Sequence, residues 1–83
     1  KIAEWVYESP PNGGYTQAVE YYKKAIKAKP DEIRHYLWLG KSLVELEDIT
    51  EAKKIFENIL NMNPGDTSDK NMQLEAKEYL EQL

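Results

Sequence analysis

The most constraining feature of this chain is that it repeats itself at an interval of 34 residues. The repeated positions are small, apolar or proline: Ala18, Tyr22, Ala25 and Pro30 return as Ala52, Phe56, Ile59 and Pro64. An interval of 34 residues is the period of a helix–turn–helix repeat, in which stacked helix pairs bury a continuous core. Such arrays build extended binding surfaces rather than enclosed active sites. The period therefore predicts an all-α solenoid that binds other molecules.

Composition narrows the classes of partner. The 83 residues include 15 acidic and 11 basic residues, a formal net charge of −4, and no cysteine. A chain without cysteine has no disulfide framework or thiolate metal site, and it fits a reducing cytoplasm. The acidic balance argues against nucleic acid, because phosphate neutralisation requires an excess of lysine and arginine. No apolar run approaches the roughly 20 residues that span a bilayer. We therefore expect a cytoplasmic module with a protein or peptide partner.

Proline and glycine divide the chain into a single domain of four parts. Residues 1–12 read as a short helix and a Pro-Pro loop, and residues 13–32 as the second helix of an incomplete repeat. Residues 33–66 read as one complete repeat and residues 67–83 as an amphipathic capping helix, giving about 1.5 recognisable repeats. Because the first residue is Lys1, we expect the chain to be a C-terminal fragment of a longer protein.

Short polar residues before the apolar stripes predict where helices begin. Thr16, Asp31 and Thr50 are the expected N-caps of the second, third and fourth helices, because their side chains can accept from free backbone N–H groups. For the last helix, the segment Asp66-Thr67-Ser68 offers several alternative caps, and the sequence does not choose among them.

Residues 13–66 resemble the tetratricopeptide repeat (TPR). The resemblance is carried within the complete repeat by Tyr36, Leu39-Gly40, Leu43, Ala52, Phe56 and Pro64. It implies that Gly40 and Ala52 let the two helices of the repeat approach closely and that Phe56 packs against the next helix pair. One departure is Glu47, which stands where the repeat usually has a turn glycine.

The two ends of the chain carry a narrower resemblance. The segments are Trp5-Val6-Tyr7-Glu8-Ser9-Pro10-Pro11 and Leu74-Glu75-Ala76-Lys77-Glu78-Tyr79-Leu80-Glu81. Around one half-repeat and one full repeat, they are similar to the C-terminal region of the regulator of microtubule dynamics family. That resemblance implies a role at microtubules and the spindle, and hence a cytoskeletal location. Some relatives sit at membrane contact sites and handle lipids, so lipid binding or transfer is the alternative function.

The TPR frame also predicts a peptide-binding groove along the first helix of each pair. Transferred residue by residue, the groove positions are Tyr7, Arg34, Leu37, Trp38, Lys41, Val44 and Glu45. Tryptophan, tyrosine and arginine often dominate binding energy, so these positions suit a peptide with an apolar anchor and an acidic neighbour. The other interpretation of Trp38 is packing against upstream structure, and the sequence leaves both open.

A second candidate surface is the dense basic run of Lys23, Lys24, Lys27 and Lys29. Four cations on the outer face of one helix could contact an acidic partner such as the tails of tubulin. The alternative is an ordinary solvated face on which Glu20 pairs with Lys24 one helical turn away.

Catalytic chemistry has no support in the sequence. His35 is the only histidine, and no serine shows a base directed at it. The acidic residues around positions 45–51 lack the ligand spacing of a calcium loop. We expect no enzyme activity, no cofactor and no metal site. Self-association through an exposed helix face is a third possible role.

Overall fold

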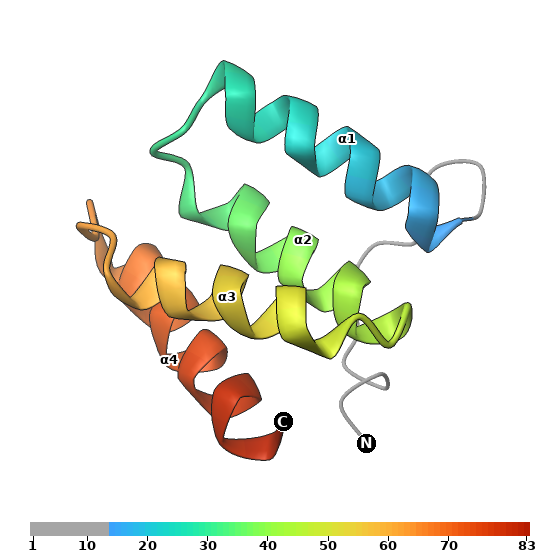
Figure 1. The fold of residues 1–83 in the computed structure, drawn as a ribbon. Helices are drawn as coiled ribbons and strands as arrows, with labels where there is room; N and C mark the ends of the chain where they lie inside the picture. The colour runs from blue at the N-terminus through green and yellow to red at the C-terminus, as the bar shows by residue number, and fades with distance from the viewer. Residues whose placement is uncertain (1–13) are drawn as a thin grey trace.

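The computed structural model describes residues 14–83, which form four helices and no strand. Helix α1 spans Tyr15–Ala28, α2 spans Ile33–Glu45, α3 spans Ile49–Leu60 and α4 spans Thr67–Gln82. Consecutive helices run antiparallel, α2 packs against both α1 and α3, and α4 packs on α3 and α2 (Figure 1). The predicted all-α, repeat-like architecture is confirmed. The short helix expected in residues 1–12 lies outside the described residues.

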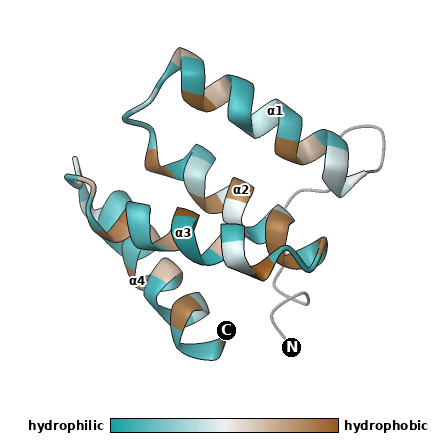
Figure 2. Ribbon diagram, in the orientation of Figure 1, coloured by the Kyte–Doolittle hydropathy of each residue, from teal (hydrophilic) through white to brown (hydrophobic). Residues whose placement is uncertain are grey.

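The core of residues 14–83 forms where the apolar stripes of the four helices meet. Its buried members are Val19, Ile33, Leu37, Leu39, Leu43, Ala52, Phe56, Ile59, Ala76 and Tyr79. Apolar and polar residues alternate around each helix with the helical period (Figure 2). Burial of one face per helix is what stabilises short helices that would be marginal alone.

Helices α2 and α3 approach each other closely at Gly40. A Cβ atom added there would lie 2.6 Å from Cε1 of Phe56, well inside van der Waals contact. The Phe56 ring in turn stacks on Tyr79 of α4, with centroids 4.7 Å apart and planes at 14°. Both packing predictions are confirmed: Gly40 permits the close approach, and Phe56 contacts the following helix.

The turn between α2 and α3 contains a glutamate in a left-handed conformation. Glu47 has a φ of 63°. Its N–H donates to the Val44 carbonyl at 2.9 Å, and the Asp48 N–H donates to the Leu43 carbonyl at 2.9 Å. These are the paired bonds of a Schellman C-terminus, which favours glycine at the left-handed position. Glu47, which departs from the repeat pattern, therefore places a residue with a Cβ atom in the left-handed conformation that glycine usually adopts.

Three predicted helix starts are wrong by one to two residues. The N-caps are Gly14, Glu32 and Asp48 rather than Thr16, Asp31 and Thr50, and no side chain of the three makes a capping hydrogen bond. Each helix instead begins at its first large apolar or aromatic residue, Tyr15, Ile33 or Ile49. Ile33 is buried, and Tyr15 and Ile49 are half-buried. A side-chain cap contributes about 1 kcal/mol, no more than a large apolar side chain gains from full or partial burial, so tertiary packing decides the boundary.

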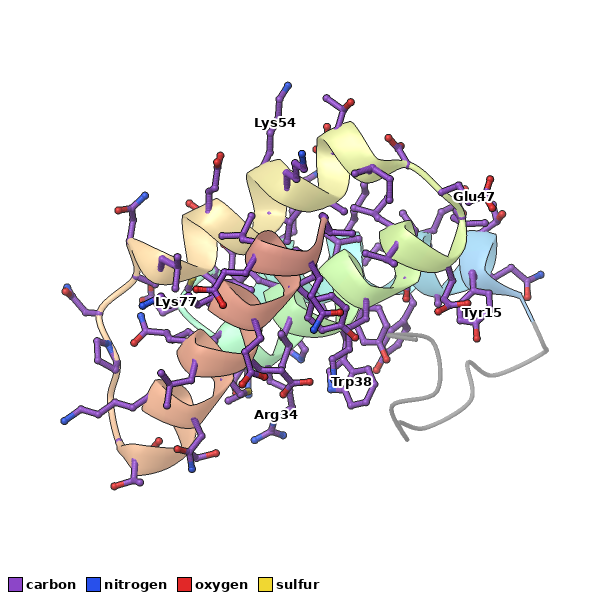
Figure 3. All side chains as sticks on the ribbon, turned by 90° about the horizontal axis from the view of Figure 1, so that it is seen from below. Tyr15, Arg34, Trp38, Glu47, Lys54 and Lys77 are labelled. Atoms are coloured by element: carbon purple, nitrogen blue, oxygen red, sulfur yellow. The ribbon has the colours of Figure 1, made fainter. Side chains whose placement is uncertain are left out.

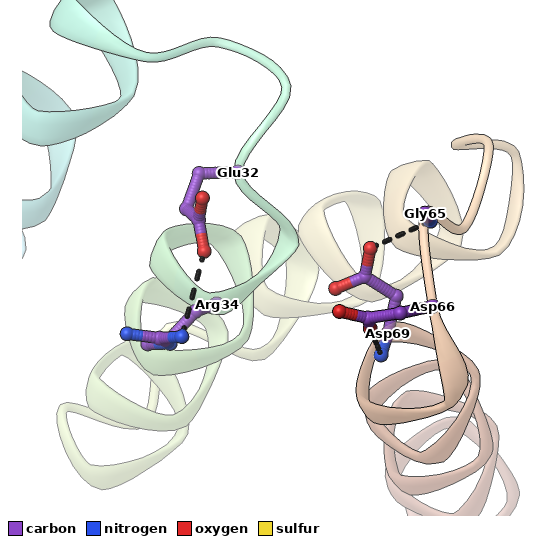
Figure 4. A network of polar contacts seen from close by, with 5 residues as sticks. All are labelled: Glu32, Arg34, Gly65, Asp66 and Asp69. Atoms are coloured by element: carbon purple, nitrogen blue, oxygen red, sulfur yellow. Dashed lines mark hydrogen bonds and ion pairs between the residues drawn. The ribbon is translucent and has the colours of Figure 1, made fainter.

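The start of α4 is the one that a side chain does cap. Asp66 is the N-cap, and its Oδ1 accepts from the Asp69 N–H at 2.9 Å (Figure 4). The Asp69 carboxylate reaches back to accept from the Gly65 N–H at 2.7 Å. This reciprocal pair selects one of the three caps that the sequence left open, and it orients the chain where it leaves the α3–α4 turn.

Gln73 joins α4 to the C-terminal end of α3. Its Nε2 donates to the Ile59 carbonyl at 3.0 Å and to the Met62 carbonyl at 2.8 Å. Carbonyls at a helix C-terminus have no partner within the helix. The amide of Gln73 therefore satisfies the end of α3 while it positions α4 against it.

Candidate interaction surfaces

The predicted groove positions that are described lie on α2. Arg34 is exposed and lies 3.8 Å from the Glu32 carboxylate, while Trp38, Val44 and Glu45 are half-buried. Arg34 and Trp38 project on the same side of the molecule, beside α4 (Figure 3). Tyr7 lies outside the described residues. Together these placements bring one aromatic and one cationic side chain to a shared face.

The side chains at two of the predicted groove positions are buried and not available to a ligand. Leu37 is 3% exposed and belongs to the core, and Lys41 is 6% exposed. Both are covered because α4 packs over this side of α2, where a TPR frame alone places the groove lining. The interpretation of Leu37 and Lys41 as accessible contact residues is therefore corrected.

Lys41 is the centre of a polar cluster between α2 and α4. Its Nζ forms an ion pair with Glu75 of α4 at 2.5 Å and lies 4.5 Å from the centroid of the Trp38 ring. A buried ammonium requires a counter-charge, and the face of an indole provides further electrostatic stabilisation. Lys41, predicted as a groove cation for an acidic partner, thus already pairs with the Glu75 carboxylate of its own chain.

Tyr79 completes this cluster on the α4 side. Burial raises the pKa of its hydroxyl far above the ordinary value, and the nearby carboxylates of Glu75 and Glu45 raise it further. The phenol therefore stays protonated throughout the physiological range, and it enters the cluster as a neutral group. Its ring stacks on Phe56, so one residue connects the polar cluster to the apolar core.

The α4 contributions to this cluster were not identified from the sequence. Glu75 precedes Ala76 in a helix with several other exposed carboxylates, and nothing in its local pattern distinguishes it from Glu78 or Glu81. Only the packing of α4 on α2 brings Glu75 to Lys41.

The α1 lysine patch consists of Lys23, Lys24, Lys27 and Lys29, all of which are exposed. Within residues 14–83 the ion pairs are Arg34–Glu32 and Lys41–Glu75, and neither involves the patch. The Glu20–Lys24 pair expected for an ordinary solvated face is not formed. Residues 15–29 hold these four lysines and one glutamate, in a chain whose net charge is −4. The patch is therefore a local positive surface on an acidic protein.

The location of Lys27 in the last turn of α1 adds to this arrangement. Cations near a helix C-terminus interact favourably with the helix dipole. The patch therefore occupies the end of α1 at which positive charge is tolerated best.

Along the described part of the chain, no helix combines the length and apolarity required to cross a membrane.

With four packed helices and no strand in residues 14–83, the chain is an all-α protein with a repeat-like fold. Its sequence matches the family described as regulator of microtubule dynamics protein 1-3 over residues 1–83. The chain belongs to that family, as the resemblance of its two ends predicted. No curated protein and no solved structure gives a significant match.

Proposed function

We propose that this chain is a non-catalytic protein-interaction module of the TPR type that attaches to microtubules through the α1 lysine patch. The observation that carries the proposal is the patch itself: four exposed lysines without ion pairs inside residues 14–83, on a chain of net charge −4. Family membership supports the choice of partner, since the family is described by regulation of microtubule dynamics.

The TPR assignment is supported by the equivalence of positions 34 residues apart. Ala18 of α1 and Ala52 of α3 are both buried, at 3% and 0% exposure. Pro30 and Pro64 each follow the end of one of these helices. Equivalent packing at a fixed interval is the physical signature of a repeat.

Electrostatics explains why such a patch suits the microtubule surface. The tails of tubulin are acidic, and a cluster of cations concentrates an acidic partner near the protein and speeds its association. Exposed charges are screened beyond about 8 Å at physiological ionic strength. Binding through the patch should therefore weaken steeply as salt is raised. We place the module in the cytoplasm, on the cytoskeleton.

The test is co-sedimentation with polymerised microtubules. Reversing Lys23, Lys24 and Lys27 to glutamate should weaken binding about tenfold or more, because each exposed charge pair contributes roughly 0.2–1 kcal/mol and reversal also adds repulsion. These side chains are exposed, so circular dichroism should show an unchanged helical fold.

A matched control reverses three exposed lysines elsewhere: Lys53, Lys54 and Lys70. This variant has the same net charge as the patch variant but leaves α1 intact. Retained binding by the control and lost binding by the patch variant support the proposal. Equal binding by both variants would show that α1 is not the contact.

A further inference from the structure

The α1 lysine patch has a sharp boundary at one end. Glu20 is exposed one helical turn before Lys23 and Lys24, on the same outward face of α1. From Lys23 to Ala28 at the end of α1 the helix advances about 7.5 Å, and Lys29, the C-cap residue just beyond it, brings the length of the patch to about 10 Å. The positive surface is therefore short. At its N-terminal edge lies the negative charge of Glu20, which repels an acidic ligand.

We infer that the patch binds an extended, unfolded acidic segment of about four residues, and that Glu20 sets the length of this site. The inference rests on the proposed function and specifies the conformation and size of the ligand. An extended chain advances about 3.3 Å per residue, so about three residues span 10 Å, and the reach of the lysine side chains adds about one more.

The surroundings of the patch favour an extended ligand over a folded one. Helical partners are usually held by apolar anchors in a groove. N-terminal to its lysines, α1 exposes the polar side chains of Thr16, Gln17 and Glu20, and Tyr21 is the one large apolar side chain that α1 exposes. Charge is then the main source of affinity, and an extended chain presents carboxylates along its whole length.

The probes are peptides of two, four, six and eight glutamates, with hexaglutamine as the neutral control, titrated at low salt and followed by NMR of the isotope-labelled chain. Shifts should be confined to residues 15–29, and affinity should rise up to tetraglutamate and then level off. Hexaglutamine should cause no shifts. Affinity that keeps rising through octaglutamate, or shifts spread over all helices, would overturn the inference.

Glu20→Lys tests the boundary directly. Replacing the repulsive charge of Glu20 by a cation should strengthen hexaglutamate binding about threefold to tenfold. The peptide length at which affinity stops rising should also increase. Glu57→Lys is the matched control, because Glu57 is exposed on α3 and the change in net charge is the same. An equal gain in both variants would mean that net charge, not the position of Glu20, governs binding.

The outcomes separate this inference from the proposed function. Lysine-dependent co-sedimentation without a response to hexaglutamate would refute the extended-tail site and leave microtubule attachment intact. If the lysine reversals change neither assay, both proposals fail.

Discussion

At the scale of single residues, backbone geometry explains one departure from the repeat pattern. Glu47 occupies a left-handed conformation with a φ of 63° in a turn whose hydrogen bonds match a Schellman motif. For a residue with a Cβ atom this conformation costs about 1–2 kcal/mol relative to the right-handed region. The motif persists because α2 and α3 pack tightly on both sides of the turn.

Glu47→Gly should therefore stabilise the protein. Relief of the left-handed strain outweighs the greater flexibility of glycine in the unfolded chain, so the free energy of unfolding should rise by about 1 kcal/mol. For a domain of this size the melting temperature should rise by about 4–8 °C.

Glu51→Gly is the control, because Glu51 lies in the first turn of α3 with a helical neighbourhood. That substitution should lower stability by about 1 kcal/mol, as glycine does within helices. Thermal unfolding of both variants checks the pair, and a lower melting temperature for Glu47→Gly would contradict the strain argument.

At the scale of elements, α4 is positioned by specific polar contacts as well as by its apolar face. Asp66 caps its start, Gln73 bonds the end of α3, and Glu75 pairs with Lys41 of α2. Directional contacts of this kind set the position of a helix whose apolar stripe alone leaves its rotation and translation less defined. The orientation of α4 is therefore specified at three places along its length.

The Lys41–Glu75 pair should show strong coupling in a double-mutant cycle. Lys41→Met alone should destabilise by about 1–3 kcal/mol, because it leaves Glu75 without its partner, although that side chain is 27% exposed and can be rehydrated in part. Adding Glu75→Leu should restore much of the loss, since an apolar pair of similar volume replaces a buried ion pair well. Additive losses in urea unfolding would contradict a direct interaction.

At the scale of the whole molecule, the polar cluster links stability to pH. The pKa of Tyr79 is raised by burial and by Glu75 and Glu45, so the folded state retains a proton that the unfolded chain releases near pH 10. A raised pKa in the folded state contributes stability below the unfolded value and loses it as pH rises further.

The free energy of unfolding should therefore fall above about pH 10, with a contribution that Tyr79→Phe removes. Phenylalanine retains the ring that stacks on Phe56, so the variant keeps the aromatic contact. Tyr21→Phe is the matched control, because Tyr21 is 57% exposed and its loss should leave the alkaline slope unchanged. Denaturant unfolding between pH 8 and 11 provides the measurement, and the same slope in the Tyr79 variant would exclude this origin.

The sequence by itself determined the class of fold, the spacing of the repeat, the close approach at Gly40 and the family. The fold class and the repeat spacing follow from local pattern: an apolar stripe of period 3.6, prolines that end helices and a 34-residue interval. The close approach at Gly40 came from the resemblance to the TPR, and the family from the resemblance of the two ends of the chain. The four lysines of the patch were also identified from the sequence, because the exposed residues of one helix and of its C-cap can be found without knowing how the helices pack.

Only the tertiary structure decided where the helices begin and which groove residues remain accessible. Thr16, Asp31 and Thr50 are good caps locally, but the burial of Ile33 and the partial burial of Tyr15 and Ile49 outweigh a single capping bond. Lys41 reads as a groove cation until α4 brings Glu75 against it. The physical reason is that helix propensity and amphipathicity act over a few residues. The contacts between α2 and α4 join residues more than thirty positions apart, and they exist only once the helices have packed.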